Sequence, residues 1–133
     1  MVTFLLNSVG ISFVTNQNDI ENWDGLSDIV IVNDFTITFP YTSPTTKSNF
    51  TVTGNGNTIY IDYPQTETWN GAFQTMNDTF VSISINVLNI NFVNLINLNG
   101  LILSNYQPYG TYNITFSRCT SVMSGYFSSY FLT

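Results

Sequence analysis

The feature that most constrains the fold of this chain is a short stretch that nearly repeats itself. Residues 88–92 (LNINF) align with residues 112–116 (YNITF), 24 positions later. Both stretches alternate apolar and polar residues, as does a strand that buries one face. Because neither stretch can bury its own apolar face, each must lie on a neighbour, as in repeat architectures. The repeat therefore predicts a parallel β-solenoid in which Ile90 stacks on Ile114 and the next apolar pair follows in the same register.

The remainder of the chain also indicates strands joined by tight corners. The Gly-Asn-Gly-Asn sequence at residues 54–57 supplies residues that accept positive φ, which predicts a sharp corner between two strands. Residues 16–25 offer an Asn or Asp N-cap, early acids and a closing Gly, which predict a short helix covering the first coil. Residues 64–79 are rich in turn formers and predict an excursion from the body of the fold. Alternation predicts strands at residues 28–32, 35–39, 50–53, 58–63 and 81–85.

Asn and Cys each allow two interpretations. Asn recurs six times between residues 86 and 99, and these side chains either form ladders inside a stack of coils or face solvent on its outer surface. The single Cys119 excludes an internal disulfide. Its strand context predicts a small buried hydrophobe, with a reactive or intermolecular thiol as the alternative.

Charge narrows the classes of partner. Charged residues make up only 8% of the chain, against about 25% in an average protein. With two Lys and Arg in total and a net charge of -6, the chain cannot neutralise a row of phosphates, so we expect no nucleic-acid binding. No apolar run is long enough to span a membrane, and the apolar start of the chain lacks the basic residue of a signal peptide. A polar but uncharged surface favours self-association.

Several segments resemble one family. Residues 49–59 (NFTVTGNGNTI) resemble the first-coil motif of the right-handed parallel β-helix superfamily, the pectin-lyase-like fold. Residues 89–94 and 113–119 look like its recurring coil unit, and residues 28–34 lie where that family often places its first strand. The resemblance covers roughly residues 11–129 and implies a right-handed parallel β-helix. Function varies widely within this fold.

The chemistry of that superfamily can be compared with this chain residue by residue. The lyases of the superfamily that this chain resembles use clustered acids to hold calcium, together with an Arg or Lys base. The hydrolases of that superfamily use paired Asp with a His. This chain has no His and no acid after Asp78, so neither set can be assembled. Zinc ligands and an imidazole-activated nucleophile are missing for the same reason. Calcium near residues 16–28 and the carboxylate pairs Asp24/Asp28 and Asp62/Glu67 are weaker alternatives. We predict no catalytic, cofactor-binding or metal-binding residues.

The carboxyl-terminal segment is the candidate binding site. A solenoid normally ends in a polar or charged cap, whereas this chain ends in a strongly apolar segment. We therefore predict contact with another copy or another assembly protein through Tyr126, Phe127, Tyr130, Phe131 and Leu132.

Sugars are the other ligand class considered. The aromatic sets Tyr106/Tyr109/Tyr112 and Tyr63/Trp69 either line a sugar-binding groove or pack inside the fold. Candidate glycosylation sequons lie at Asn49, Asn77 and Asn113.

These observations predict one all-β domain over residues 1–133: a strand and cap region at 1–27, coils at 28–129 and a tail at 130–133. The expected fold is a right-handed parallel β-helix or solenoid with a short N-terminal helical cap, and an antiparallel β-sandwich or jelly roll is the alternative. The expected function is non-enzymatic: a building block of a virion surface layer, fibre or extracellular filament, located on a virion or extracellular surface. A carbohydrate-binding or polysaccharide-degrading module of pectin-lyase-like type is the functional alternative.

Overall fold

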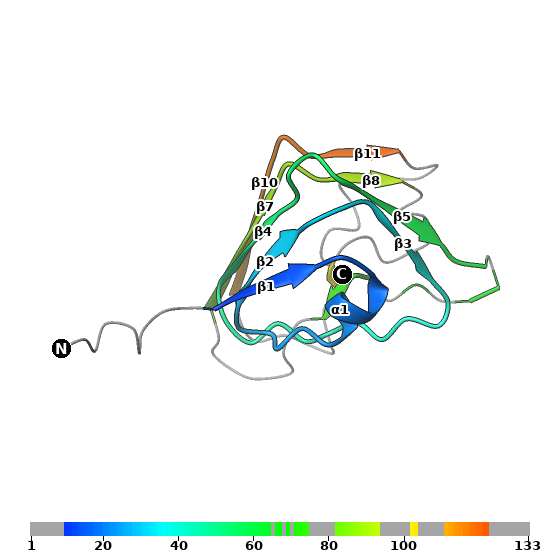
Figure 1. Ribbon diagram of the computed structural model, residues 1–133. Helices are drawn as coiled ribbons and strands as arrows, with labels where there is room; N and C mark the ends of the chain where they lie inside the picture. Colours follow the sequence, from blue (N-terminus) through cyan, green and yellow to red (C-terminus); the bar gives the residue numbers. More distant parts are fainter. Residues whose placement is uncertain are drawn as a thin grey trace.

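The computed structural model describes residues 10–64, 66–67, 69, 71–74, 82–93, 102–103 and 111–122. Strands dominate these residues, together with one short helix, α1 (Gln17–Glu21), so the predicted all-β class is confirmed (Figure 1). The first sheet contains, in spatial order, β1 (Ile11–Val14), β2 (Asp28–Ile31), β4 (Phe50–Thr53), β7 (Ser82–Leu88) and β10 (Thr111–Ser117). The second sheet contains β3 (Phe35–Thr38), β5 (Thr58–Asp62), β8 (Asn91–Val93) and β11 (Thr120–Val122), in that order from one edge to the other. A third, two-stranded sheet pairs β6 (Phe73–Gln74) with β9 (Ile102–Leu103).

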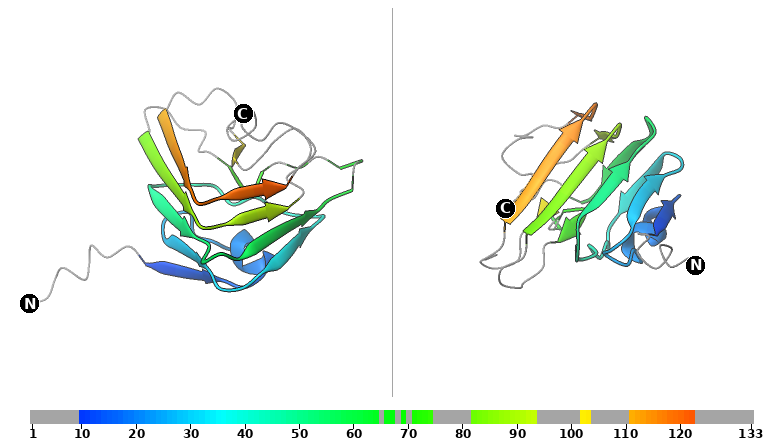
Figure 2. Two further views of the ribbon diagram at one scale, coloured as in Figure 1. Left: turned by 90° about the horizontal axis from the view of Figure 1, so that it is seen from above. Right: turned by 90° about the vertical axis from the view of Figure 1, so that its left-hand side faces the viewer.

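All strand pairs in the described part of the chain are parallel. The chain runs along a strand of the first sheet, turns a corner and continues along a strand of the second, four times in succession. Figure 2 (right) shows the first sheet side by side from β1 in blue, at the end where α1 lies, to β10 in orange at the other end. The antiparallel β-sandwich, which the sequence left as the alternative fold, is therefore wrong.

The predicted stacking register is also wrong. Ile114 of β10 pairs with Ile85 of β7, an offset of 29 residues, and does not stack on Ile90. Phe116 pairs with Val87, while Phe92, its predicted partner, lies in β8 of the second sheet. The reason is the corner at Asn89 (φ 56°), which interrupts the first copy of the repeat, whereas the second copy lies within the uninterrupted strand β10. Alternation alone does not reveal where a strand turns.

The corners between the two sheets use residues with positive φ. Asn55 (φ 56°) and Gly56 (φ 78°) form the predicted corner between β4 and β5, which is thereby confirmed. Asn89 has φ 56° between β7 and β8, and Arg118 has φ 55° at the equivalent point between β10 and β11. Gly and Asn tolerate this conformation well, whereas it is uncommon for Arg.

The core lies between the sheets and is built from inward-facing aliphatic side chains. On the first sheet Ile29, Val52 and Val87 are all nearly inaccessible to solvent and occupy one register row. On the second sheet Phe35, Ile59 and Phe92 form the corresponding row. Each large apolar side chain so buried contributes about 1.5–3 kcal/mol relative to exposure. The alternation in the sequence thus identifies the faces of these strands that form the core.

The segment after β5 closes the third side of the core and is not the predicted excursion. Trp69 is fully buried and stacks on Tyr41 with ring centroids 5.4 Å apart. Phe73 of β6 packs against Trp23 and Phe50. These aromatic contacts add buried apolar area to the core, which the many turn-forming residues of the segment do not predict.

Outward-facing Asn side chains hydrogen-bond to Thr side chains on neighbouring strands. The Asn86 amide Nδ2 donates to Thr51 Oγ1 (3.4 Å), and its Oδ1 accepts from Thr115 Oγ1 (2.6 Å), so one outward-facing Asn links three adjacent strands. Asn91 Oδ1 accepts from Thr120 Oγ1 (2.6 Å) in the second sheet. For these two residues the outward-facing interpretation is correct and the ladder inside the stack is wrong, although their side chains hydrogen-bond to Thr on neighbouring strands. Asn94, Asn97 and Asn99 lie outside the described residues.

Candidate assembly surface

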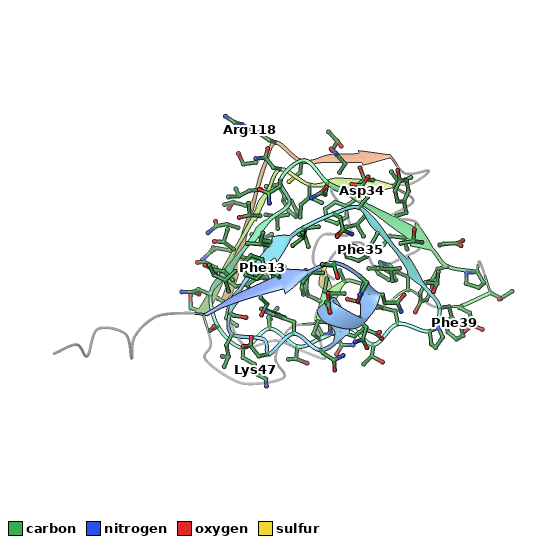
Figure 3. The ribbon with its side chains drawn as sticks, viewed as in Figure 1. Phe13, Asp34, Phe35, Phe39, Lys47 and Arg118 are labelled. Carbon is green, nitrogen blue, oxygen red and sulfur yellow. The ribbon has the colours of Figure 1, made fainter. Side chains whose placement is uncertain are left out.

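The outer face of the first sheet carries exposed apolar side chains at its β1 end. Because Val14 points into the core, Ile11 and Phe13 of the same strand point outward, and they are 58% and 64% exposed. Phe13 pairs in register with Val30 of β2, which is half-buried, and Val32 just beyond β2 is 49% exposed. We call these four residues the β1 face. Figure 3 labels Phe13 on β1, at the near end of the stack.

Strand β1 is also one of the two edge strands of the first sheet, the other being β10. The carbonyl groups of Gly10 and Val14 accept hydrogen bonds from the N–H groups of Asp28 and Val32. Main-chain groups alternate in direction along a strand, so those of Ile11 and Phe13 point to the opposite side of β1. No strand of the described part of the chain pairs with that side. Among the described residues, the two most exposed large apolar side chains, Ile11 and Phe13, therefore belong to the residues whose main-chain groups face this unpaired side.

The equivalent edge of the second sheet is covered by helix α1. The Gln17 side-chain amide binds the outer edge of β3: its Oε1 accepts from the Thr38 N–H (2.8 Å) and its Nε2 donates to the Thr38 carbonyl (3.0 Å). Nε2 also donates to the Pro40 carbonyl, and Glu21 Oε2 accepts from the Thr42 N–H (2.8 Å). A side-chain amide here takes the place of the peptide group of a neighbouring strand. The predicted helix is confirmed, and it protects this edge from pairing with another chain.

Asp19 closes the end of the β1 edge. Its carboxylate accepts hydrogen bonds from the N–H (2.8 Å) and the hydroxyl (2.7 Å) of Thr15. Asn16 caps the helix start by accepting from the Asp19 N–H (2.9 Å). The Thr15 N–H and then its hydroxyl hold the pKa of Asp19 below its ordinary value of 3.8. The open part of the edge is thus limited to Ile11 and Phe13.

Asp24 organises the loop that leads into β2. Its Oδ1 accepts hydrogen bonds from the N–H groups of Ser27 and Leu26 (both 2.8 Å) and from the Ser27 hydroxyl (2.9 Å). The Ser27 N–H and then the Leu26 N–H lower the pKa of Asp24 below its ordinary value of 3.8.

The lowered pKa values predict acid sensitivity. A carboxylate whose pKa is lower in the folded state contributes stability above its unfolded pKa, and this stability is lost as the pH falls through the folded pKa. We expect the free energy of unfolding to decrease on acidification below about pH 4, and to decrease less steeply in the Asp24→Asn variant. Urea unfolding between about pH 5 and pH 2 measures both slopes. Equal slopes in the variant and the natural protein would contradict the assignment.

The structure places only some of the residues that the sequence nominated as sites. Asn49 is exposed, and its Oδ1 accepts from the Ser84 N–H (2.8 Å). Asn113 is exposed on β10. The sequon at Asn77 and the predicted assembly residues all lie outside the described residues: Tyr126, Phe127, Tyr130, Phe131 and Leu132. The β1 face was not predicted from the sequence. The feature that could have indicated it is the presence of Ile11 and Phe13 on either side of a polar residue in a short strand.

Two nominated aromatic residues belong to the interior. Tyr63 is 8% exposed, its hydroxyl accepts a hydrogen bond from the Tyr41 N–H (2.8 Å), and its ring packs edge-on to Trp69 at 5.2 Å. Interior packing, and not a sugar-binding groove, is therefore the correct interpretation of this pair. Tyr106 and Tyr109 lie outside the described residues.

Cys119 is half-buried rather than fully buried. Its side chain packs against the core, and its thiol lies 3.3 Å from the Val87 carbonyl, to which it donates. The interpretation as a small apolar side chain agrees with this packing, while the side chain retains some exposure.

The cavity between the two sheets offers little room for a small molecule. The space between the sheets that is open to the centre of a water molecule amounts to about 10 Å³ and is lined only by apolar residues, among them Ile37, Ile61 and Ile90. A site of this size without polar partners does not hold even one ordered water. Among the described residues, no three acids or Cys gather as ligands for a metal ion. The helical part of that same region includes no segment of the length and apolarity needed to cross a bilayer.

Comparison with known protein families, curated proteins and solved structures finds no match to this chain. The surface described above combines an apolar face with a strand edge that has no partner among the described residues, two features on which an extended polypeptide can pair.

Proposed function

We propose that this chain is a right-handed parallel β-solenoid of the pectin-lyase-like kind and that its role is structural and non-enzymatic. The solenoid interpretation is supported by four successive passes through two parallel sheets. Right-handedness follows from the rule that parallel crossover connections are right-handed in about 98% of cases. In this role the chain is a building block of a virion surface layer, a fibre or an extracellular filament.

One observation carries the proposal: the open edge of β1 together with the exposed side chains of Ile11 and Phe13. Natural sheet proteins cover or charge their edge strands, because an open edge recruits other chains. This chain covers the edge of β3 with Gln17, whereas no strand among the described residues pairs with the outer side of β1. An edge so treated serves association with another polypeptide.

Low charge supports the same role. Two basic residues and eight acids leave most of the surface uncharged, so copies of the chain repel one another weakly. Outward-facing Asn and Thr side chains hydrogen-bond to one another across neighbouring strands, which gives a polar surface with few charges. Such a surface suits close packing in a layer or filament.

Association of the purified chain tests the proposed function. We expect concentration-dependent oligomers or filaments in sedimentation velocity and in negative-stain electron microscopy. A chain that remains monomeric up to its solubility limit, and that binds no component of an assembly, would overturn the structural role.

A separate incubation of the chain with pectate, alginate and neutral glycans, with and without calcium, tests the enzymatic alternative and should release no products. Turnover abolished by a single Asp substitution would instead favour the polysaccharide-degrading alternative.

A further inference from the structure

The corner between β4 and β5 holds an Asn-Gly pair in one turn conformation. Asn55 (φ 56°) and Gly56 (φ 78°) are the central residues of this turn, and the Asn57 N–H donates to the Gly54 carbonyl (3.0 Å) across them. Positive φ at both central residues is typical of a type I′ turn, in which Asn-Gly is a preferred pair. Both central residues are exposed, and the space beside Gly56 is open. Water and hydroxide therefore have access to this peptide group.

An Asn followed by Gly carries a reactivity of its own. When the Gly56 amide loses its proton to hydroxide, its nitrogen can attack Asn55 Cγ, so that an N–Cγ bond forms and Nδ2 leaves as ammonia. Water then opens the resulting succinimide ring. Cleavage at Cγ gives Asp, and cleavage at the main-chain carbonyl carbon gives isoaspartate. Gly favours the attack because it has no side chain to hinder its nitrogen.

The folded corner opposes this reaction through the main chain. The Gly56 N–H donates to the Asn89 carbonyl of the next pass (2.8 Å), so the proton that must leave is held in a hydrogen bond. Ring closure also needs the Gly56 nitrogen to rotate towards Asn55 Cβ about the Cα–C bond, and this rotation abandons the type I′ conformation. The Asn55 amide itself makes only a long hydrogen bond, to the Ile31 carbonyl (3.4 Å). The turn, and not the side-chain contact, therefore limits the reaction.

We propose that Asn55 is a site of spontaneous deamidation that reacts only when the corner between β4 and β5 opens. An amide held in a hydrogen bond of this kind loses its proton from locally opened states, as it does in hydrogen exchange. The rate of modification therefore reports the opening of this corner. This inference goes beyond the proposed function, because the reaction needs no partner and is measured on the dilute chain.

The isoaspartate product cannot rebuild the corner. Isoaspartate routes the main chain through the side-chain methylene, which adds one carbon atom to the main chain between β4 and β5. Gly54, next to the modified residue, has no room even for a Cβ, because that atom would collide with the Ile90 side chain and the Asn89 carbonyl oxygen. A corner this tightly packed does not absorb an added atom. The modification thus converts a local opening into a lasting loss of the corner.

Deamidation rates in the folded and the unfolded chain test the role of the corner. The natural full-length chain is incubated at mildly alkaline pH, in buffer and in unfolding urea, and peptide mapping by mass spectrometry measures conversion at Asn55. We expect conversion in buffer to be about tenfold or more slower than in urea. The Asn-Gly pairs at Asn70 and Asn99 serve as standards in urea, where all three should react at similar rates. Equal rates in buffer and urea, or no conversion at Asn55 while the standards react, would overturn the proposal.

A variant that loosens the corner tests the same point in buffer. Gly54→Ala forces a Cβ against the next pass, whereas Gly10→Ala is the matched control, since its Cβ would come no closer than 3.9 Å to a neighbour. We expect conversion at Asn55 in buffer to be about tenfold faster in Gly54→Ala and unchanged in Gly10→Ala, with equal rates for both in urea. A folded Gly54→Ala chain that reacts at the natural rate would contradict the proposal.

Hydrogen exchange of the natural chain gives a measurement that does not depend on any variant. The Gly56 amide should be protected in buffer, and low concentrations of urea should speed its exchange and the conversion of Asn55 in parallel. An unprotected Gly56 amide, or conversion that does not follow its exchange, would show that the corner does not control the reaction.

The stability of the product tests the effect of the lengthened main chain. Chains carrying isoaspartate at position 55 are separated by chromatography and identified by electron-transfer fragmentation. We expect their urea midpoint to be lower than that of the natural chain, and lower than that of Asn55→Asp, which has the same charge and an unaltered main chain. Equal midpoints for the isoaspartate chain and Asn55→Asp would show that the corner accommodates the added atom, and this part of the proposal would be wrong.

Discussion

Replacing Ile90 with Asp is expected to prevent folding of the chain. Ile90 is 1% exposed and lies directly after the corner between β7 and β8, with its side chain in the apolar interior. An unpaired carboxylate there has no hydrogen-bond donor to replace water, and its burial costs about 3–5 kcal/mol or more. A domain of this size has a net stability of about 5–15 kcal/mol, so this loss removes most or all of it.

Far-UV circular dichroism and urea unfolding measure the effect of Ile90→Asp. The control is Thr36→Asp, because Thr36 is exposed on the outer face of β3. We expect this control to change the free energy of unfolding by less than about 1 kcal/mol. Native spectra and an unchanged urea midpoint for Ile90→Asp would show that the side chain is not inside the core.

Replacing Gly54 with Ala is expected to cost about 2–4 kcal/mol. A Cβ at this position would collide with the Ile90 side chain and with the carbonyl oxygen of Asn89. The Ile90 side chain is confined by the core, and the Asn89 carbonyl accepts a hydrogen bond from the Gly56 N–H (2.8 Å). Neither neighbour can move without loosening the corner of the next pass of the chain. The requirement for Gly here is space.

Variants at two other glycines distinguish the effect of a close contact from the effect of backbone conformation. A Cβ on Gly10 would come no closer than 3.9 Å to its nearest neighbour, so Gly10→Ala should change the stability by less than about 0.5 kcal/mol. Gly56 has open space around it but a φ of 78°, so Gly56→Ala should cost about 1 kcal/mol through strain alone. Urea midpoints of the three variants test this ranking. A Gly54→Ala midpoint equal to that of Gly10→Ala would contradict the close contact.

Strand identity and the polarity of strand faces could be predicted because they depend on local chemistry. Alternation along residues 50–53 and 58–62 is matched by the observed burial of every second side chain. The corner at Asn55 and Gly56 followed from residues that accept positive φ. The helix at residues 17–21 followed from its cap and acids. These signals act over a few neighbouring residues, so they are present in the sequence itself.

The register and the candidate surface could not be predicted in this way. Asn89 looks like any other polar residue of an alternating strand, and only its neighbours in the stack make it a corner. The hydrogen bonds between the Gln17 side chain and Thr38 join groups 21 residues apart, and no local sequence pattern distinguishes this Gln from one that faces solvent. The exposure of Ile11 and Phe13 depends on β1 being the edge strand, since the same residues on an inner strand would have neighbours on both sides.

The sequence by itself determined that this chain forms strands with one apolar face, tight Asn and Gly corners, and a weakly charged surface. Those properties follow from side-chain polarity, backbone preference and charge, which each residue carries with it. Tertiary structure decided which strands pair, with an offset of 29 residues between β7 and β10 in place of 24. It also decided that the β3 edge is covered by Gln17, while the β1 edge at Phe13 has no strand partner among the described residues. Strand pairing and side-chain exposure depend on all the strands that lie around a given strand, because its apolar face can be buried equally well against any apolar partner of suitable shape.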